Sequence, residues 1–219
     1  MQTRISAWDI DWDQREPCGE VDLGYCADRH IILVCEGQNS VDKKAGPEKK
    51  LTPLGQEQMT RVANRLAELN LSYCYIMSST SIAGQESLAI ISKEIDAKKS
   101  GVNESLKDGH PVVPEPSRLL TPIPDHEFHQ NVMKMEYAYR ATFHRPDAKM
   151  SEDSYEVLIC PSNVIKYFIC RALQLPAAGW ARFAIPQGSI TWIIIDKMGN
   201  VAAESVGETG HLDFKKITF

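Results

Sequence analysis

The chain has 219 residues, with 24 Lys and Arg against 29 Asp and Glu, a formal charge of −5, and 43% hydrophobic residues. This balance is that of one sizeable α/β domain with extensions, and its mild acidity argues against a nucleic-acid partner, which would require a basic surface. No apolar run reaches the roughly 18 residues of a membrane span, and the start of the chain is too polar for a signal peptide.

Residues 1–29 are predicted to form an N-terminal arm before a domain of residues 30–219. The arm shows neither helical nor strand periodicity. It does carry two indoles four residues apart among acidic side chains, namely Trp8, Asp9, Asp11, Trp12 and Asp13. An arm that folds back on its own domain and an arm that docks on a neighbouring subunit would both use these residues.

The domain opens with the β-branched run His30–Cys35, which is typical of a central parallel strand. Residues 39–50 are rich in Gly, Pro and Lys and are predicted to be a solvated loop. Thr52 is then a suitable N-cap, with Pro53 at the first helical position. Apolar residues recur at helical spacing afterwards, so we expect a helix over residues 53–69.

The remaining chain alternates between strand and helix patterns. Strands are predicted at 73–77, 156–160, 189–195 and 201–206, helices at 81–97, 127–144 and from 163 onward, a polar loop at 98–116 and a short extended piece at 118–123. Asn163 is the predicted cap of the last helix. This alternation predicts an α/β fold, in which a mostly parallel sheet carries helices on both faces.

The six cysteines form no CxxC pair. Several lie inside apolar strand or helix patterns, as Cys35 and Cys160 do. Disulfide frameworks are typical of small secreted domains, and this chain shows no secretion signal. We therefore expect reduced, buried thiols.

Three motifs, Ile31–Gln38, Leu51–Gln58 and Ser78-Ser79, resemble the histidine phosphatase (phosphoglycerate mutase) superfamily. The similarity is greatest to its mitochondrial Ser/Thr protein phosphatases. Segments 8–17, 152–176 and 188–218 resemble their Trp-Asp multimerisation motif, last core strand and helix, and C-terminal hairpin. The resemblance covers nearly the whole chain and implies the phosphoglycerate mutase-like fold.

The chain departs from the family at the positions that carry its chemistry. In the family, an Arg and a nucleophilic His end the first strand, and a second Arg, an acid/base Glu and a second His complete the site. The resemblance places these five roles on Cys35, Glu36, Ile82, Leu119 and Pro161. We therefore expect a degenerate site without catalytic residues.

Physical chemistry leads to the same expectation. Ligands of open α/β sheets bind beyond the carboxyl ends of the strands. A carboxylate there repels a phosphate dianion by about 4 kcal/mol at ~4 Å and an effective dielectric of 20. We interpret Glu36 as a solvent-facing carboxylate; a base, a metal ligand and a receptor for a cation are the alternatives. His126 and His129 are expected on the surface.

We expect a catalytically inactive pseudophosphatase that acts as an oligomeric scaffold or regulator, without cofactor or metal. A Ser/Thr or small-molecule phosphatase with residual or altered activity is the alternative. A binding module that uses the acidic pocket for a cationic ligand is the third hypothesis.

The resemblance also bears on assembly and location. It implies that Trp8 and Trp12 dock the arm on a neighbour, giving a homo-oligomer larger than a dimer, either alone or with an active paralogue. The sequence does not identify another protein partner. The family is mitochondrial through an N-terminal membrane segment; the chain shows none, and a cytoplasmic location is expected if no anchor precedes Met1.

Overall fold

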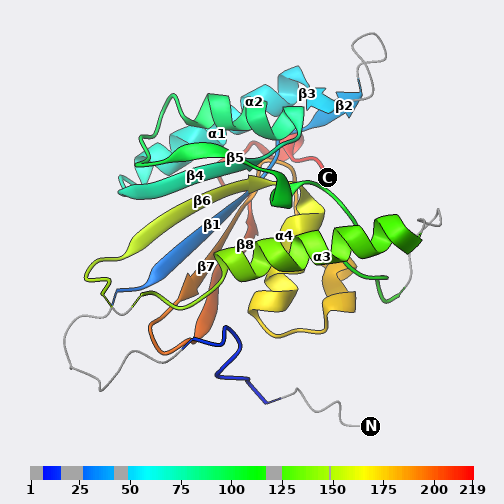
Figure 1. Cartoon of the computed structure of the whole chain (residues 1–219). Helices are drawn as coiled ribbons and strands as arrows, with labels where there is room; N and C mark the ends of the chain where they lie inside the picture. The colour runs from blue at the N-terminus through cyan, green and yellow to red at the C-terminus, as the bar shows by residue number, and fades with distance from the viewer. Residues whose placement is uncertain (1–6, 16–26, 42–48, 117–124, 148) are drawn as a thin grey trace.

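A six-stranded sheet forms the centre of the fold in the computed structural model, which describes residues 7–15, 27–41, 49–116, 125–147 and 149–219 (Figure 1). Its strands are β1 (Arg29–Cys35), β4 (Tyr73–Ser79), β5 (Ser100–Asn103), β6 (Ser154–Cys160), β7 (Ile190–Ile195) and β8 (Val201–Glu208). Their order is β5-β4-β6-β1-β7-β8, and the first four are parallel to one another. β7 runs antiparallel to both of its neighbours. The expected mostly parallel α/β fold is confirmed.

Helices cover both faces of this sheet (Figure 1). They are α1 (Pro53–Glu68), α2 (Ile82–Ile91), α3 (Asp125–Thr142) and α4 (Ser162–Ala172). Because strand side chains alternate between faces, Ile32 and Val34 of β1 pack with α1 and α2, whereas Ile31 and Leu33 pack with α3 and α4. β1 is therefore buried on both sides, as its continuous apolar run predicts.

The start of α1 was predicted correctly. The Thr52 hydroxyl accepts a hydrogen bond from the backbone N–H of Gly55 at 3.0 Å, and Pro53 is the first helical residue. α1 ends at Glu68, one residue before the predicted end.

Other boundaries differ from the expectation. The predicted loop at 39–50 contains a short hairpin of β2 (Asn39–Val41) and β3 (Lys49–Leu51), and the predicted loop at 98–116 contains β5. α2 stops at Ile91 rather than near residue 97, because the chain must turn back to pair β5 with β4. The extended piece expected at 118–123 lies outside the described residues.

β8 forms one edge of the sheet and is twice as long as β5 at the other edge, with eight residues against four. Its pairing with β7 is irregular at Ile190 and Trp192, and Gly207 has a φ of +64°, a conformation that favours glycine. β8 also carries Glu204 and Glu208.

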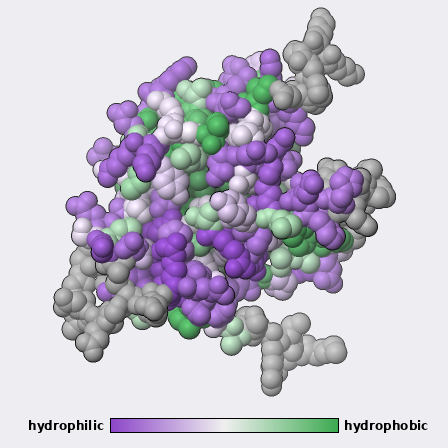
Figure 2. All heavy atoms as spheres, viewed as in Figure 1, coloured by the Kyte–Doolittle hydropathy of each residue, from purple (hydrophilic) through white to green (hydrophobic). Residues whose placement is uncertain are grey.

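The surface is mainly hydrophilic on the face shown in Figure 2, with hydrophobic residues in small separate groups. In the described part of the chain, no helix combines the length and apolar character that crossing a bilayer requires.

Candidate functional site

The parallel strands point their carboxyl ends to one edge of the sheet, close to the end of the chain (Figure 1). A cavity of 170 Å³ lies there. Its described lining consists of Cys35, Glu36, Asn39, Lys49, Ser81, Ala83, Asp108, Pro161, Ser162, Gln187 and Phe219. This is the place where open α/β sheets bind ligands, so we take it as the candidate site.

Glu36, directly after β1, is the main feature of the cavity. The residue is only 5% exposed, so the expectation of a solvent-facing carboxylate was wrong. Oε1 accepts hydrogen bonds from the hydroxyls of Ser79, at 2.5 Å, and Ser81, at 2.8 Å. Burial raises the pKa of the Glu36 carboxyl, and the two serine hydroxyls offset part of that increase.

The serines come from the end of β4 and the start of α2. Ser81 is the N-cap of α2, and its hydroxyl also accepts a hydrogen bond from the backbone N–H of Gly84 at 2.9 Å. A Cβ on Gly84 would lie 2.4 Å from the Ser79 hydroxyl oxygen and 2.8 Å from Oε1 of Glu36. A glycine is therefore needed for α2 to approach the carboxylate, which lies near the positive end of the helix dipole.

Cys35 precedes Glu36 and is 2% exposed. Burial, and secondarily the Glu36 charge, raise the pKa of its thiol well above the ordinary value. The neighbouring Cys160 is buried, and its thiol pKa is raised by the same two effects. Since the thiolate is the nucleophilic form, burial disfavours a nucleophilic role for both cysteines. The four described cysteines are free thiols, as expected; Cys18 and Cys26 lie outside the described residues.

The other degenerate positions contribute no polar group to phosphate. Ile82 is the first residue of α2, and Pro161 is the N-cap of α4 without a side-chain cap. Asn163 was wrongly predicted as that cap, because it lies inside the helix and its amide donates to Asp108 at 3.1 Å. Leu119 lies outside the described residues.

The histidines of the domain do not replace the missing ones. Nδ1 of His30 accepts a hydrogen bond from the Trp192 indole at 3.0 Å, at the opposite end of β1. His126 and His129 are exposed on α3, as expected. Within the described lining of the cavity, Lys49 is the one cationic residue and no His or Arg is present. No three His, Cys, Asp or Glu residues of the described chain come together as metal ligands.

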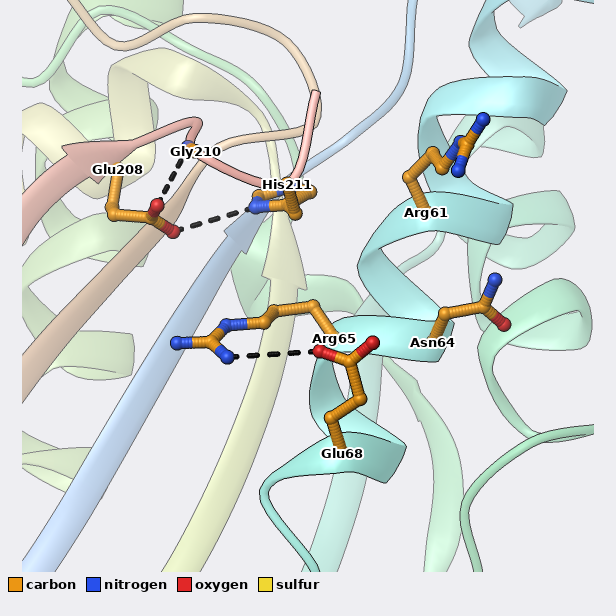
Figure 3. A pocket seen from close by; sticks show the side chains of 7 residues that line it. All are labelled: Arg61, Asn64, Arg65, Glu68, Glu208, Gly210 and His211. Carbon is orange, nitrogen blue, oxygen red and sulfur yellow. Dashed lines mark hydrogen bonds and ion pairs between the residues drawn. The ribbon is translucent and has the colours of Figure 1, made fainter. Parts of the chain in front are cut away.

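A larger hollow of 390 Å³ lies between α1 and the segment after β8 (Figure 3). Its charged side chains are Arg61, Arg65, Glu68 and Glu208, two of each sign. The Arg65–Glu68 pair is 3.7 Å apart, with side chains 45% and 69% exposed. This arrangement is typical of a solvated surface rather than of a built site.

The described part of the arm, residues 7–15, lies against its own domain. The Trp12 indole donates to the carbonyl of Gly199 at 2.8 Å and packs near Tyr139. Asp13 forms a 3.0 Å ion pair with Arg145, and both side chains are almost fully buried, at 1% and 3% exposed.

The other arm residues are less enclosed. The backbone of Asp9 exchanges two hydrogen bonds with the Gln174 side chain, at 2.7 and 2.8 Å. Asp11 is exposed, and Trp8 is 39% exposed. Within a single chain, Trp12 and Asp13 are therefore internal anchors, whereas Trp8 remains available to a neighbour.

The sequence did not reveal the two serines or Asp108 as companions of Glu36. Ser79 and Ser81 are 43 and 45 residues away from Glu36 along the chain. The Ser78-Ser79 pair at the end of a predicted strand was the available signal, because strand ends of a parallel sheet meet at one edge.

Comparison with known proteins places these features in a family. No protein-family model matches the chain. It is 36% identical to the mitochondrial serine/threonine-protein phosphatase PGAM5 of Xenopus laevis, over 96% of this chain and 83% of that protein. Against human PGAM5 the identity is also 36%, covering 96% of this chain and 80% of the human protein. Caenorhabditis elegans Pgam5 gives 36%, with coverages of 97% and 80%.

Solved structures agree with this placement. A Plasmodium falciparum phosphoglycerate mutase superimposes with a TM-score of 0.61 at 28% identity, covering 88% of this chain and 99% of that one. Bacillus stearothermophilus YhfR gives a TM-score of 0.64 at 16% identity, with coverages of 84% and 98%, and shows the same fold.

Proposed function

Because the chain belongs to the PGAM5 family of mitochondrial serine/threonine-protein phosphatases, within the histidine phosphatase superfamily, we propose that it is a non-hydrolytic member: a mitochondrial pseudophosphatase that acts as an oligomeric scaffold or regulator. The proposal has two parts, the loss of phosphate chemistry and the use of the arm in assembly. They rest on different observations.

The buried Glu36 carboxylate carries the first part. It stands where the resemblance places the nucleophilic His, and its Oε1 is held by two serine hydroxyls. Phosphoryl transfer needs a nucleophile together with cations or donors for the nonbridging oxygens. The described lining of the cavity offers the buried Glu36 carboxyl, the buried Cys35 thiol, Asp108 and one lysine. An incoming phosphate dianion would be repelled.

An assay on the full chain tests this part. We expect no hydrolysis of 4-nitrophenyl phosphate or of phosphoserine and phosphothreonine peptides above a buffer blank. Losses within one catalytic unit are not additive, so partial activity is not expected. Turnover well above the blank that disappears in Glu36→Ala would contradict the proposal and favour the alternative, a phosphatase with altered chemistry.

A restored site provides the positive control. The combined substitution Cys35→Arg, Glu36→His, Ile82→Arg and Pro161→His returns the family's residue types to four of the five positions. We expect the restored protein to bind inorganic phosphate in this cavity, and the unaltered cavity not to bind it, as isothermal calorimetry would measure.

Assembly through the arm is the second part. Trp8 and the 53%-exposed Ile10 lie on an arm that Trp12 and Asp13 fix to the domain. Trp8 is 39% exposed, so docking it removes about 60–100 Å² of the 150–250 Å² of an indole, roughly 1.5–2.5 kcal/mol before ordering costs. We expect light scattering to give a homo-oligomer larger than a dimer, and Trp8→Ala to reduce its mass while leaving the domain folded. A monomeric intact chain would contradict this part.

The mitochondrial location is proposed from the relatives' names. Fractionation of cells that express the natural gene product tests it, with recovery in the mitochondrial fraction as the expected result. Recovery in the cytosol alone would contradict it.

A further inference from the structure

Only one of the two oxygens of the Glu36 carboxylate accepts hydrogen bonds from described residues. Both serine hydroxyls donate to Oε1, and among the described residues no group donates a hydrogen bond to Oε2. No described Lys, Arg or His lies within ion-pair distance of Glu36, although the residue is 95% buried, at 5% exposed. A buried charge without a counter-charge is costly, so an entering cation would gain a strong partner here.

The surroundings of Glu36 keep it suited to a cation. The N-terminus of α2 and the two serine hydroxyls favour the ionised form of Glu36. Asp108 adds a second carboxyl group to the lining, with Oδ1 accepting from the Asn163 amide at 3.1 Å. Asn39 and Gln187 also line the space of 170 Å³, and the Gln187 amide oxygen accepts from the Thr218 hydroxyl at 2.7 Å. Lys49 is the one described lining cation; its charge favours the ionised form of Glu36 without forming an ion pair with it. Lys166, next to the cavity, interacts electrostatically with Asp108 and Cys35.

The remaining walls indicate the shape of the ligand. Ala83, Pro161 and Phe219 give the cavity apolar surface beside its carboxylates. A ligand with a compact charged end and an aliphatic stem matches both. An ammonium group has three donors, which suits the oxygens of Glu36 and Asp108.

We propose that the cavity is a receptor for an alkylammonium group, the chemistry shared by a lysine side chain of a partner protein and a small primary amine. The inference deepens the proposed function, because the site that binds anions in a phosphatase would here bind a cation. It requires Glu36 to be ionised and Oε2 to be accessible from the cavity. It does not depend on the arm or on the oligomer.

The test is an NMR titration of the ¹⁵N-labelled full chain at pH 7.5 with n-butylammonium chloride. n-Butanol serves as the uncharged ligand of similar shape, and NaCl as the ionic-strength control. We expect saturable shifts of the backbone amides of Glu36, Ser81 and Gly84 with butylammonium alone. The affinity of N-acetyl-lysine methylamide relative to butylammonium then distinguishes a lysine side chain from a small free amine, and its Nζ-acetylated form is the uncharged control.

Two matched variants localise the binding. Glu36→Gln keeps the shape and removes the charge, and we expect it to bind butylammonium at least about tenfold more weakly. Glu204→Gln makes the same change on the exposed side of β8 and is expected to bind like the unaltered chain. Thermal unfolding of both variants confirms that each is folded.

Several results would overturn the proposal. They are an absence of saturable shifts, equal binding of butanol and butylammonium, and an affinity that Glu36→Gln leaves unchanged. Phosphatase activity in the separate assay would instead contradict the proposed function, so the two failures are distinguishable.

Discussion

Removing the Asp13 carboxylate tests how the arm is held. Asp13 accepts a hydrogen bond from the Arg145 backbone N–H at 2.7 Å and one from its guanidinium Nε at 3.0 Å. In Asp13→Ala, Arg145 keeps its charge and its contact to the Ile10 carbonyl but loses its counter-ion. Removing one partner of a buried ion pair costs about 3–5 kcal/mol.

The arm is attached at one end of the domain, so it can move away and let water reach Arg145. We therefore expect the cost to appear as undocking of residues 7–15 and not as unfolding of the sheet. A loss of 3–5 kcal/mol corresponds to a roughly 150- to 5,000-fold increase in arm opening. The Trp12–Gly199 hydrogen bond and the two exposed Asp9–Gln174 hydrogen bonds remain, each worth about 1 kcal/mol, and do not exceed this loss.

Hydrogen–deuterium exchange measures this opening directly. The Asp9 amide, which donates to the Gln174 side chain of the domain at 2.7 Å, reports on docking of the arm. Asp11→Ala is the matched control, because it removes an exposed carboxylate two residues away. If Asp13→Ala and Asp11→Ala exchange at the same rate in residues 7–15, the buried ion pair does not hold the arm and the reasoning is refuted.

Three further predictions concern the cavity. Burial raises the pKa of the Glu36 carboxyl above its ordinary value of 4.5, so ionised Glu36 destabilises the fold above the folded-state pKa. Glu36→Gln should therefore need more urea to unfold than the unaltered chain at pH 8. This difference in urea midpoint should close as the pH falls through the folded-state pKa towards 4.5. Gly84→Ala should lower the free energy of unfolding by about 1–3 kcal/mol because its Cβ meets Glu36 and Ser79, whereas Gly101→Ala, with its nearest contact at 3.4 Å, should be tolerated in the same urea titrations. Iodoacetamide followed by mass spectrometry should modify the half-buried Cys74 in the native protein and Cys35 only after unfolding.

The strands and helices with strong local patterns were predictable. β1 and β6 are continuous β-branched or aliphatic runs, and α1 has both a cap and a helical stripe. β5 was missed because Ser100–Asn103 is a polar edge strand, whose side chains carry no apolar alternation. The hairpin of β2 and β3 was missed because each strand contributes three residues.

The position of the candidate site was predictable from the sequence, but the burial of Glu36 in it was not. Cys35, Glu36 and Pro161 follow the ends of two predicted parallel strands, which meet at one edge of the sheet, and the structure places all three in one cavity. Whether a carboxylate faces water or lies buried depends on which distant groups meet it. Glu36 is buried because Ser79 and Ser81 supply hydroxyls from another strand and helix, and local sequence does not encode that encounter.

The edge formed by β8 has a consequence for how copies of this chain can associate. A long open edge strand is a template for pairing with a second sheet, and proteins suppress this with bulges and charged side chains. β8 has both, since its register with β7 slips twice and Glu204 and Glu208 would oppose like charges in a paired copy. Growth of the sheet from chain to chain through β8 is thereby disfavoured, so copies that associate would do so through another surface.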